Sequence, residues 1–180
     1  MRNKIFMISD THFHHKRIIE YADRPFANVL SMNKTIIKNW NAVVSKNDKV
    51  FHIGDIGFGT TEDMIKIFKQ LNGYKILIRG NHDKRFSDGA LIRIGFSEIY
   101  KYPIILEEFY ILSHAPLFLN DGSNMINLYG HVHEKQVIDS SNHINMCVEH
   151  TNYTPVLFKT IKKQINQNII DRNKNDLIIE

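Results

Sequence analysis

Apolar segments that suit β-strands alternate with helical patterns along the first half of the chain, and this order constrains the fold most strongly. The strand-like segments are Ile5–Ile8, Lys49–Ile53 and Tyr74–Ile78. Between them, apolar residues recur at helical spacing from about Ser31 to Val44, and again from Thr60 or Thr61 to Leu71. Ser31 and one of the two threonines are the expected N-caps. Strand, helix, strand, helix, strand in this order predicts a parallel sheet covered by helices.

The second half of the chain is richer in strands. Tyr100–Leu106 and Phe109–Ser113 predict a hairpin, while Ile126–Tyr129 and Ile144–Val148 are further strand candidates. A terminal helix is expected from Val156 to Ile170, followed by a polar stretch that we expect to fray. A chain of 180 residues can bury a core of its own, so we predict one domain over residues 1–180. The expected fold is α/β, with two facing sheets flanked by helices.

Charge and cysteine content restrict the class of protein. The net charge is +4 with scattered basic residues, which favours anionic substrates and is weak evidence for nucleic-acid binding. Cys147 is the only cysteine, which excludes an intramolecular disulfide and argues against a thiolate metal site. No apolar stretch is long enough to span a bilayer, and the first apolar run is too short for a signal peptide. We therefore expect a soluble, cytoplasmic protein without a membrane partner.

Potential metal ligands follow the apolar segments. They form five short runs, namely Asp10-Thr-His12, Gly54-Asp55, Gly80-Asn81-His82-Asp83, Ser113-His114 and Gly130-His131-Val-His133. Ligand sites in α/β sheets gather beyond the carboxyl ends of the strands, so these side chains are expected to converge. The two i, i+2 pairs would point to the same side of an extended chain. Each glycine lets the backbone approach an ion closely or adopt dihedral angles that other residues avoid.

The donor types indicate a metal-dependent hydrolase. Mixed imidazole nitrogen and Asp or Asn oxygen ligands suit Mn, Fe, Co, Ni or Zn better than Ca or Mg. Two such ions about 3.5–4 Å apart can share a carboxylate and a hydroxide in an in-line displacement at phosphorus. His82 directly follows a predicted ligand, so it could protonate the leaving oxygen, with Asp83 fixing its ring. Any one such residue alone is usually an ordinary loop residue, and the prediction therefore depends on five runs occurring together. The remaining histidines are assigned ordinary structural roles, namely His14, His15, His52, His143 and His150.

The order D-x-H, G-D, G-N-H-[DE], H, G-H-x-H resembles the calcineurin-like metallophosphoesterase superfamily, over a match from Asp10 to His133. The resemblance implies a four-layer α/β/β/α sandwich of two mixed sheets and helices, with a binuclear site between its loops. The residues that it assigns to one metal are Asp10, His12, Asp55 and His133. Those that it assigns to the second metal are Asp55, which would bridge, with Asn81, His114 and His131. His82 corresponds to the catalytic histidine, and Asp83 stands where many members have Glu.

Other stretches resemble a compact bacterial and phage branch of small phosphoesterases. They are Asp10-Thr-His-Phe-His-His, Arg24-Pro-Phe, Asn39-Trp-Asn and the segment from Asn145 to Pro155. Similarity to small members without a cap domain favours diesters over monoesters as substrates. The predicted function is hydrolysis of a small phosphodiester, such as a nucleotide, by in-line attack of a metal-bridging hydroxide.

Several points stay open at this level. A metal-dependent nuclease and a phosphomonoesterase are alternatives. A non-catalytic interaction scaffold is less favoured, because every ligand position of the family pattern carries a suitable residue. Nucleic acid is a less favoured substrate than a small ester. Manganese is the first expectation for both ions, with iron, cobalt, nickel or zinc as alternatives, and the oligomeric state is open, a homodimer included. Candidate substrate contacts are His14, Arg17, Arg24, Lys84 and Arg85, with Phe26 and Tyr153 either stacking on a base or packing as hydrophobes.

Overall fold

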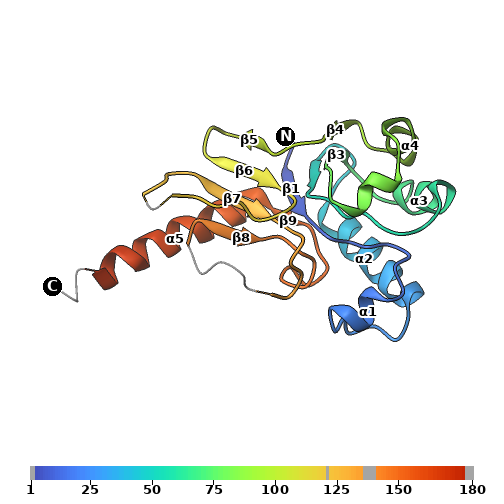
Figure 1. The fold of residues 1–180 in the computed structure, drawn as a ribbon, viewed down its shortest axis with the longest axis horizontal. Coiled ribbons are helices and arrows are strands. Elements are labelled where there is room, and N and C mark those ends of the chain that lie inside the picture. The colour runs from blue at the N-terminus through green and yellow to red at the C-terminus, as the bar shows by residue number, and fades with distance from the viewer. Residues whose placement is uncertain (1–2, 121, 136–140, 177–180) are drawn as a thin grey trace.

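Two β-sheets lie at the centre of the molecule, as the computed structural model shows for residues 3–120, 122–135 and 141–176 (Figure 1). The first sheet has the strand order β4-β3-β2-β1-β9. Its strands are β1 (Ile5–Ile8), β2 (Lys49–His52), β3 (Tyr74–Ile78), β4 (Glu98–Tyr100) and β9 (Val156–Leu157). Strands β1 to β4 run parallel, and β9 is antiparallel to β1. The predicted parallel sheet in the first half of the chain is therefore confirmed.

The second sheet is also mixed and has the order β5-β6-β7-β8. Its strands are β5 (Ile104–Leu106), β6 (Tyr110–Ser113), β7 (Ile126–Tyr129) and β8 (His143–Asn145). The predicted hairpin is present as antiparallel β5 and β6, whereas β6, β7 and β8 pair in parallel. The predicted strand from Tyr100 to Leu106 is divided, because β4 pairs with β3 in the first sheet and β5 pairs with β6 in the second. Pro103, which has no N–H to donate to a ladder, lies between them.

The helices connect the strands of the first sheet and close the chain. They are α1 (Ile18–Tyr21), α2 (Val29–Val43), α3 (Thr61–Phe68), α4 (Asp88–Ile94) and α5 (Phe158–Asp176), with a 3₁₀ turn, η1 (His82–Arg85). Asn28 caps α2 and Ser31 returns the bond as part of a capping box, so the helix begins earlier than predicted. Thr60 caps α3 in the same way. The helix α5 begins after β9 and continues to Asp176, past the predicted end.

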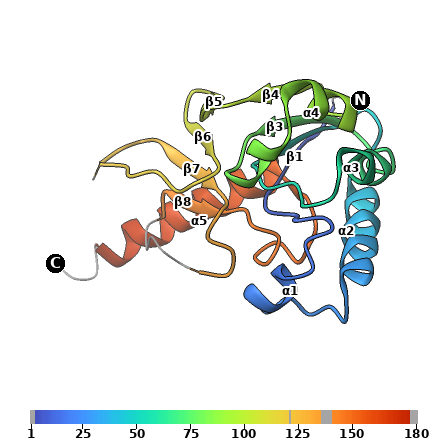
Figure 2. The same cartoon turned by 45° about the vertical axis from the view of Figure 1, so that its right-hand side comes forward.

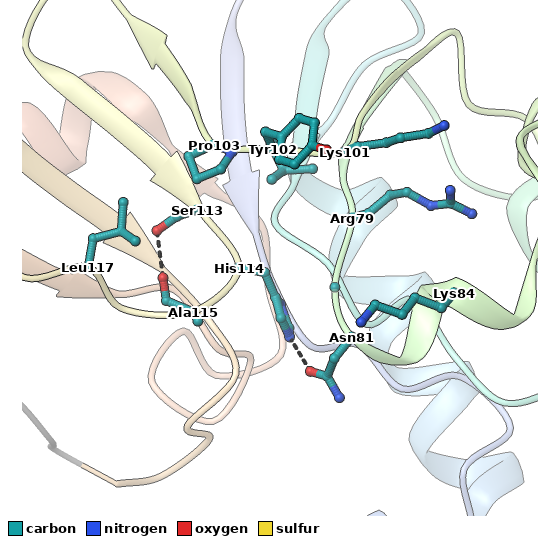
Figure 3. Close-up of a pocket in the computed structure, with 12 residues that line it drawn as sticks. Arg79, Asn81, Lys84, Lys101, Tyr102, Pro103, Ser113, His114, Ala115 and Leu117 are labelled. Carbon is teal, nitrogen blue, oxygen red and sulfur yellow. Dashed lines mark hydrogen bonds between the residues drawn. The ribbon is translucent and has the colours of Figure 1, made fainter.

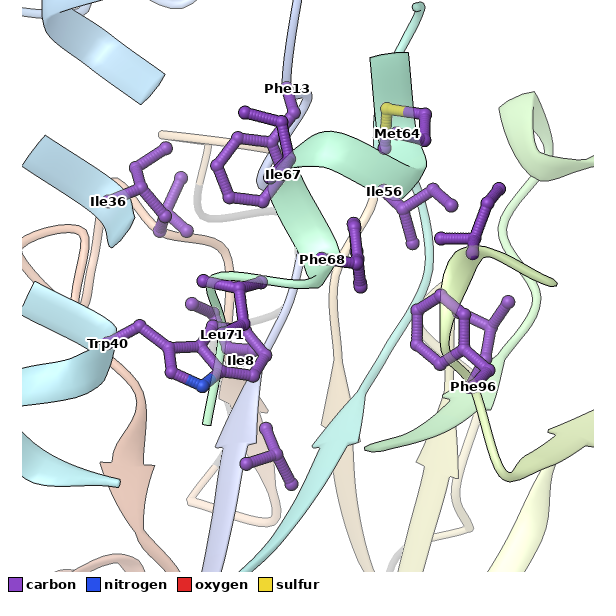
Figure 4. Close-up of a cluster of buried hydrophobic side chains, with 14 of the residues drawn as sticks. Ile8, Phe13, Ile36, Trp40, Ile56, Met64, Ile67, Phe68, Leu71 and Phe96 are labelled. Carbon is purple, nitrogen blue, oxygen red and sulfur yellow. The ribbon is translucent and has the colours of Figure 1, made fainter. Parts of the chain in front are cut away.

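Two apolar cores cover the two faces of the first sheet. Phe6 and Ile8 of β1 point to helices α2 and α3, where Trp40 and Phe68 are fully buried (Figure 4). Met7, between them in the sequence, contributes instead to the core shared with the second sheet and α5. This alternation follows from the two-residue period of a strand. Both views show α2 and α3 on one side of the first sheet and β6 to β8 on the other (Figures 1 and 2).

The architecture confirms the predicted fold class, because two facing mixed sheets are flanked by helices. It agrees with the sandwich of two mixed sheets and helices that the resemblance implied. Neither α4 nor η1 was predicted, since seven and four residues are too short to carry a clear periodic pattern. In the part of the chain that the structure describes, no helix combines the length and the apolar character needed to cross a membrane.

Candidate metal centre

The predicted ligands lie beyond the carboxyl ends of strands from both sheets. Asp10, Asp55 and Asn81 follow β1, β2 and β3, while His114 and His131 follow β6 and β7. Short backbone bonds hold the loops together, for example the Asp10 amide donating to the Gly54 carbonyl at 3.0 Å. All seven predicted ligands form one connected cluster, whose members are Asp10, His12, Asp55, Asn81, His114, His131 and His133.

The backbone of the ligand loops is left-handed at five of these positions. The φ angles are 57° at Asp10, 48° at His12, 57° at Asp55, 74° at His131 and 53° at His133. The predicted reason for their convergence, an extended chain at the i, i+2 pairs, is therefore wrong. Side chains with a Cβ rarely adopt this region, and such strain collects at functional sites where the surroundings enforce it.

Two glycines are required by close contact within the site. A Cβ on Gly80 would clash with the Asp55 carboxylate, and a Cβ on Gly130 would clash with the Ser9 hydroxyl and the Asp10 carboxylate. Gly54 has φ +91°, so it also needs the left-handed region. Of the two reasons predicted for these glycines, unusual dihedral angles apply to Gly54, and the close approach at Gly80 and Gly130 is that of protein side chains.

Asp10 has one oxygen held by the protein and one left free. Its Oδ2 accepts from the Ser9 hydroxyl at 2.5 Å, the His131 amide at 2.9 Å and the Cys147 thiol at 3.3 Å. Its Oδ1 is buried and makes no hydrogen bond to any residue that the structure describes, and it lies 3.6 Å from Nε2 of His12. A buried carboxylate oxygen without a donor is costly unless a cation binds there.

Asp55 is arranged in the same way at the centre of the cluster. Its Oδ1 accepts from the amide of His82 at 2.9 Å. Its Oδ2 lies 3.7 Å from Nε2 of His12 on one side and 3.5 Å from Nε2 of His114 on the other. A carboxylate oxygen between two imidazoles from different sheets is suited to join two ligand groups.

The imidazoles are oriented by bonds to their second nitrogen. Nδ1 of His114 bonds to the Ile53 carbonyl at 2.9 Å, and Nδ1 of His133 lies 3.1 Å from the Glu149 carboxylate. Nδ1 of His12 contacts His15 at 3.2 Å, while its buried Nε2 makes no hydrogen bond within the described part of the chain. Such bonds leave the other nitrogen as a lone-pair donor, which is how metal-binding histidines are usually held.

Asn81 joins the second half of the cluster. Its Oδ1 lies 2.9 Å from Nε2 of His114 and 2.9 Å from Nδ1 of His131. Both nitrogens therefore point to the same amide oxygen. The unpartnered atoms of Asp10 and His12, together with this set of converging oxygens and nitrogens, fit divalent transition-metal ions.

Electrostatics of the site reflect the close carboxylates and imidazoles. Burial would raise the pKa of Asp10, but the imidazoles of His12 and His114 hold this pKa well below its usual range. Burial likewise opposes protonation of His114, yet the Asp55 and Asp10 carboxylates raise the pKa of this imidazole to about 9. For His12, burial is the larger influence and lowers the pKa. In the metal-free protein the His114 imidazolium therefore balances part of the negative charge of Asp10 and Asp55, a role that a bound cation can take over.

His82 lies at the edge of the cluster with 45% of its side chain exposed. Its Nε2 is 3.9 Å from Oδ2 of Asp55, so the ring reaches the centre of the site. The ring packs against Phe58 at 4.8 Å between centroids, and Phe58 in turn stacks on His15 at 3.8 Å. Phe58 was not recognised from the sequence, because an isolated aromatic residue carries no motif.

Asp83 has a different role from the predicted one. Its buried carboxylate accepts from the backbone amides of Gly80 at 2.8 Å, Asp55 at 2.9 Å and Ile56 at 2.9 Å. No hydrogen bond between Asp83 and the His82 imidazole is present among the described residues. Burial raises the pKa of this carboxyl, against the effect of the amides. Asp83 therefore fastens the loop after β2 to the loop after β3.

Glu149 and Arg24 form a buried ion pair behind the first half of the cluster. The carboxylate is 2.7 Å from the guanidinium and also holds His133, while Arg24 donates to the carbonyl oxygen of Asp10 at 2.8 Å. Arg24 is 3% exposed, so the suggestion that it contacts substrate is wrong. Glu149 was not recognised from the sequence as part of the site, because no motif relates its position in the chain to that of a ligand.

The other candidates are mostly structural. Phe26 and Tyr153 pack edge to face at 4.7 Å, which confirms packing over base stacking. His52 is fully buried against the Thr11 hydroxyl at 2.9 Å, and burial lowers its pKa to about 3. The Cys147 thiol is a donor to Asp10, and burial raises its pKa far above the usual range.

Comparison with known sequences identifies a family and two relatives, one along nearly the whole chain and one along part of it. A family model described as calcineurin-like phosphoesterase matches residues 3–179. An uncharacterised protein of Methanocaldococcus jannaschii is 37% identical over 187 residues, covering 97% of this chain and 98% of the relative. The gene 66 protein of Mycobacterium phage L5 is 38% identical over 78 residues, which cover 42% of this chain and 37% of that protein.

Solved structures show the same fold. A protein of unknown function from Aquifex aeolicus has a TM-score of 0.72 and 26% identity, covering 90% of this chain and 99% of that one. A nuclease from Pseudomonas putida has a TM-score of 0.51 and 20% identity, covering 72% of this chain and 61% of that one. At this identity the second likeness concerns the fold alone.

Proposed function

The chain belongs to the calcineurin-like phosphoesterase family, and from this premise we propose that it hydrolyses phosphodiester bonds with two divalent metal ions. The observation that carries the proposal is Oδ2 of Asp55, which lies between His12 and His114 while Oδ1 is held by a backbone amide. Two cations sharing this carboxylate would each meet further ligands that already converge.

The two proposed ligand groups follow from the contacts. The group on one side consists of Asp10, His12, Asp55 and His133. The group on the other side consists of Asp55, Asn81, His114 and His131. Ions held there supply stabilisation of phosphate charge and a nucleophile formed from water at neutral pH. These nitrogen and oxygen donors are compatible with manganese, which we propose first, and also with iron, cobalt, nickel or zinc.

His82 is the proposed general acid. Water adds to phosphorus and loses one proton to solvent, the bond from phosphorus to one ester oxygen breaks, and an imidazolium at His82 gives its proton to that oxygen. The ring is near the centre yet half exposed, so solvent can return the proton after each turnover. Phe58 and the amide contact of His82 with Asp55 keep the ring in this place.

The test compares bis-p-nitrophenyl phosphate with p-nitrophenyl phosphate, first after chelation and then with Mn²⁺ restored. We expect diester cleavage that depends on Mn²⁺ and exceeds monoester cleavage. His82→Ala should retain its metal content and lose about 10²- to 10⁴-fold in kcat. Cleavage of the monoester alone would refute the diester preference, and absence of both activities with two ions bound would refute the proposed reaction.

A further inference from the structure

A pocket of about 460 Å³ opens beside the candidate metal centre (Figure 3). Asn81 and His114 belong both to its lining and to the second ligand group. In Figure 3 these two residues lie between a cationic side, with Lys84 and Arg79, and an apolar side with Leu117. The volume suits a small organic ligand. Whatever occupies the pocket is therefore adjacent to the atoms that would bind the reacting phosphate.

The cationic side chains that line the pocket differ in whether other groups of the protein already pair with them. Arg79 pairs with Asp88 at 2.8 Å and donates to two backbone carbonyls, so its guanidinium serves the fold. Lys101 shares Asp88 at 3.3 Å. Lys84 is exposed and has no carboxylate partner among the described residues. Lys84 is thus the cation best placed to receive an anion, two residues after His82.

Most of the remaining lining is apolar, and it includes an exposed aromatic ring. Tyr102 is 79% exposed at the rim, on the turn that passes from β4 to β5. Pro103 lies beside it, and Ala115 and Leu117 add apolar lining on the other side of the pocket. An exposed aromatic ring and a cation that line one pocket are the combination that binds nucleotides without regard to sequence, since every base has a face that stacks.

We propose that this pocket binds one nucleotide unit of the substrate, with the base on Tyr102 and a second phosphate at Lys84. The substrate class is then a short single-stranded oligonucleotide, in which the diester at the metal centre continues into a neighbouring nucleotide. This inference builds on the proposed phosphodiesterase function and narrows it. A diester without a base would leave Tyr102 and Lys84 unused.

Binding of three probes to the Mn²⁺-loaded protein tests the pocket by calorimetry. The probes are inorganic phosphate, thymidine 5′-monophosphate and thymidine 3′,5′-bisphosphate. We expect affinity to increase in that order. Tyr102→Ala should reduce the preference for the monophosphate over phosphate by about 5- to 150-fold, the range for stacking of one base. Lys84→Ala should reduce the preference for the bisphosphate over the monophosphate by about 2- to 5-fold, and more at low salt.

Matched controls are available on exposed residues elsewhere. Phe109→Ala removes another exposed aromatic ring, and Lys34→Ala removes an exposed cation on α2. Neither substitution should change the ratio of affinities between any two of the three probes. Equal affinity for all three probes in the native protein, or ratios unchanged by Tyr102→Ala and Lys84→Ala, would overturn the inference. Hydrolysis of bis-p-nitrophenyl phosphate is measured in parallel. If the affinity ratios are as expected but no hydrolysis occurs, the proposed reaction is refuted and the proposed nucleotide pocket still stands.

Discussion

Replacing Asp83 by Asn distinguishes two roles for this residue. The structure shows its carboxylate fastening two loops, whereas the sequence predicted that it orients the His82 ring. The carboxylate accepts three backbone amides, from Gly80, Asp55 and Ile56, and is fully buried. An asparagine has a single acceptor oxygen, so retaining the bonds of Gly80 and Asp55 turns its NH₂ group toward the amide of Ile56. At least one buried N–H then loses its partner.

The magnitude follows from these bonds. An unsatisfied buried donor costs about 1–3 kcal/mol, and each of the two retained bonds loses about 1 kcal/mol because its acceptor is no longer charged. The neutral amide is easier to bury than a carboxylate, which offsets part of the loss. We expect Asp83→Asn to lower the free energy of unfolding by about 2–4 kcal/mol.

Urea unfolding of the metal-free protein measures this difference, with the fluorescence of the single tryptophan, buried Trp40, as the signal. With a slope of about 2 kcal/mol per molar urea, the midpoint should fall by about 1–2 M. Asp88→Asn is the matched control, since that carboxylate is 51% exposed and its loss should cost less than about 1 kcal/mol. An unchanged midpoint for Asp83→Asn, with hydrolysis reduced, would refute the structural role and support orientation of the His82 ring.

Three further predictions concern the metal centre. Gly130→Ala should destabilise the protein by about 1–3 kcal/mol in thermal unfolding, because the new methyl group meets the Ser9 hydroxyl and the Asp10 carboxylate; a native melting temperature would contradict this close approach. In the metal-free protein the pKa of His114 is raised to about 9, so protonated His114 stabilises the folded state. This contribution to the free energy of unfolding is complete below about pH 6.5 and is lost as pH rises to 9, by up to about 3 kcal/mol. Denaturation at several pH values should show this slope without metal and not with metal bound, since a coordinated imidazole carries no such proton. Glu149→Gln should weaken metal binding about 10- to 100-fold in a titration with Mn²⁺, and equal affinity would show that its carboxylate does not position a ligand.

The sequence by itself determined the fold class and the set of ligand candidates. Apolar periodicity is a local property, so β3 and β7 were predicted with the bounds that they have. Donor chemistry is also a property of residue type, and the order of Asp, Asn and His after successive strands needed no coordinates. Elements shorter than two turns, such as η1 and α4, carry too little pattern to be predicted.

Only the tertiary structure decided which partner each polar group has. Asp83 adjoins His82 in sequence, yet its oxygens are taken by amides from a loop 27 and 28 residues away, because buried amides must be satisfied. Glu149 reaches Arg24 across 125 residues of chain, and no local pattern encodes that distance. The left-handed backbone at the ligands and the exposed Tyr102 beside the site likewise arise where two sheets meet, so they depend on packing between segments that the sequence keeps far apart.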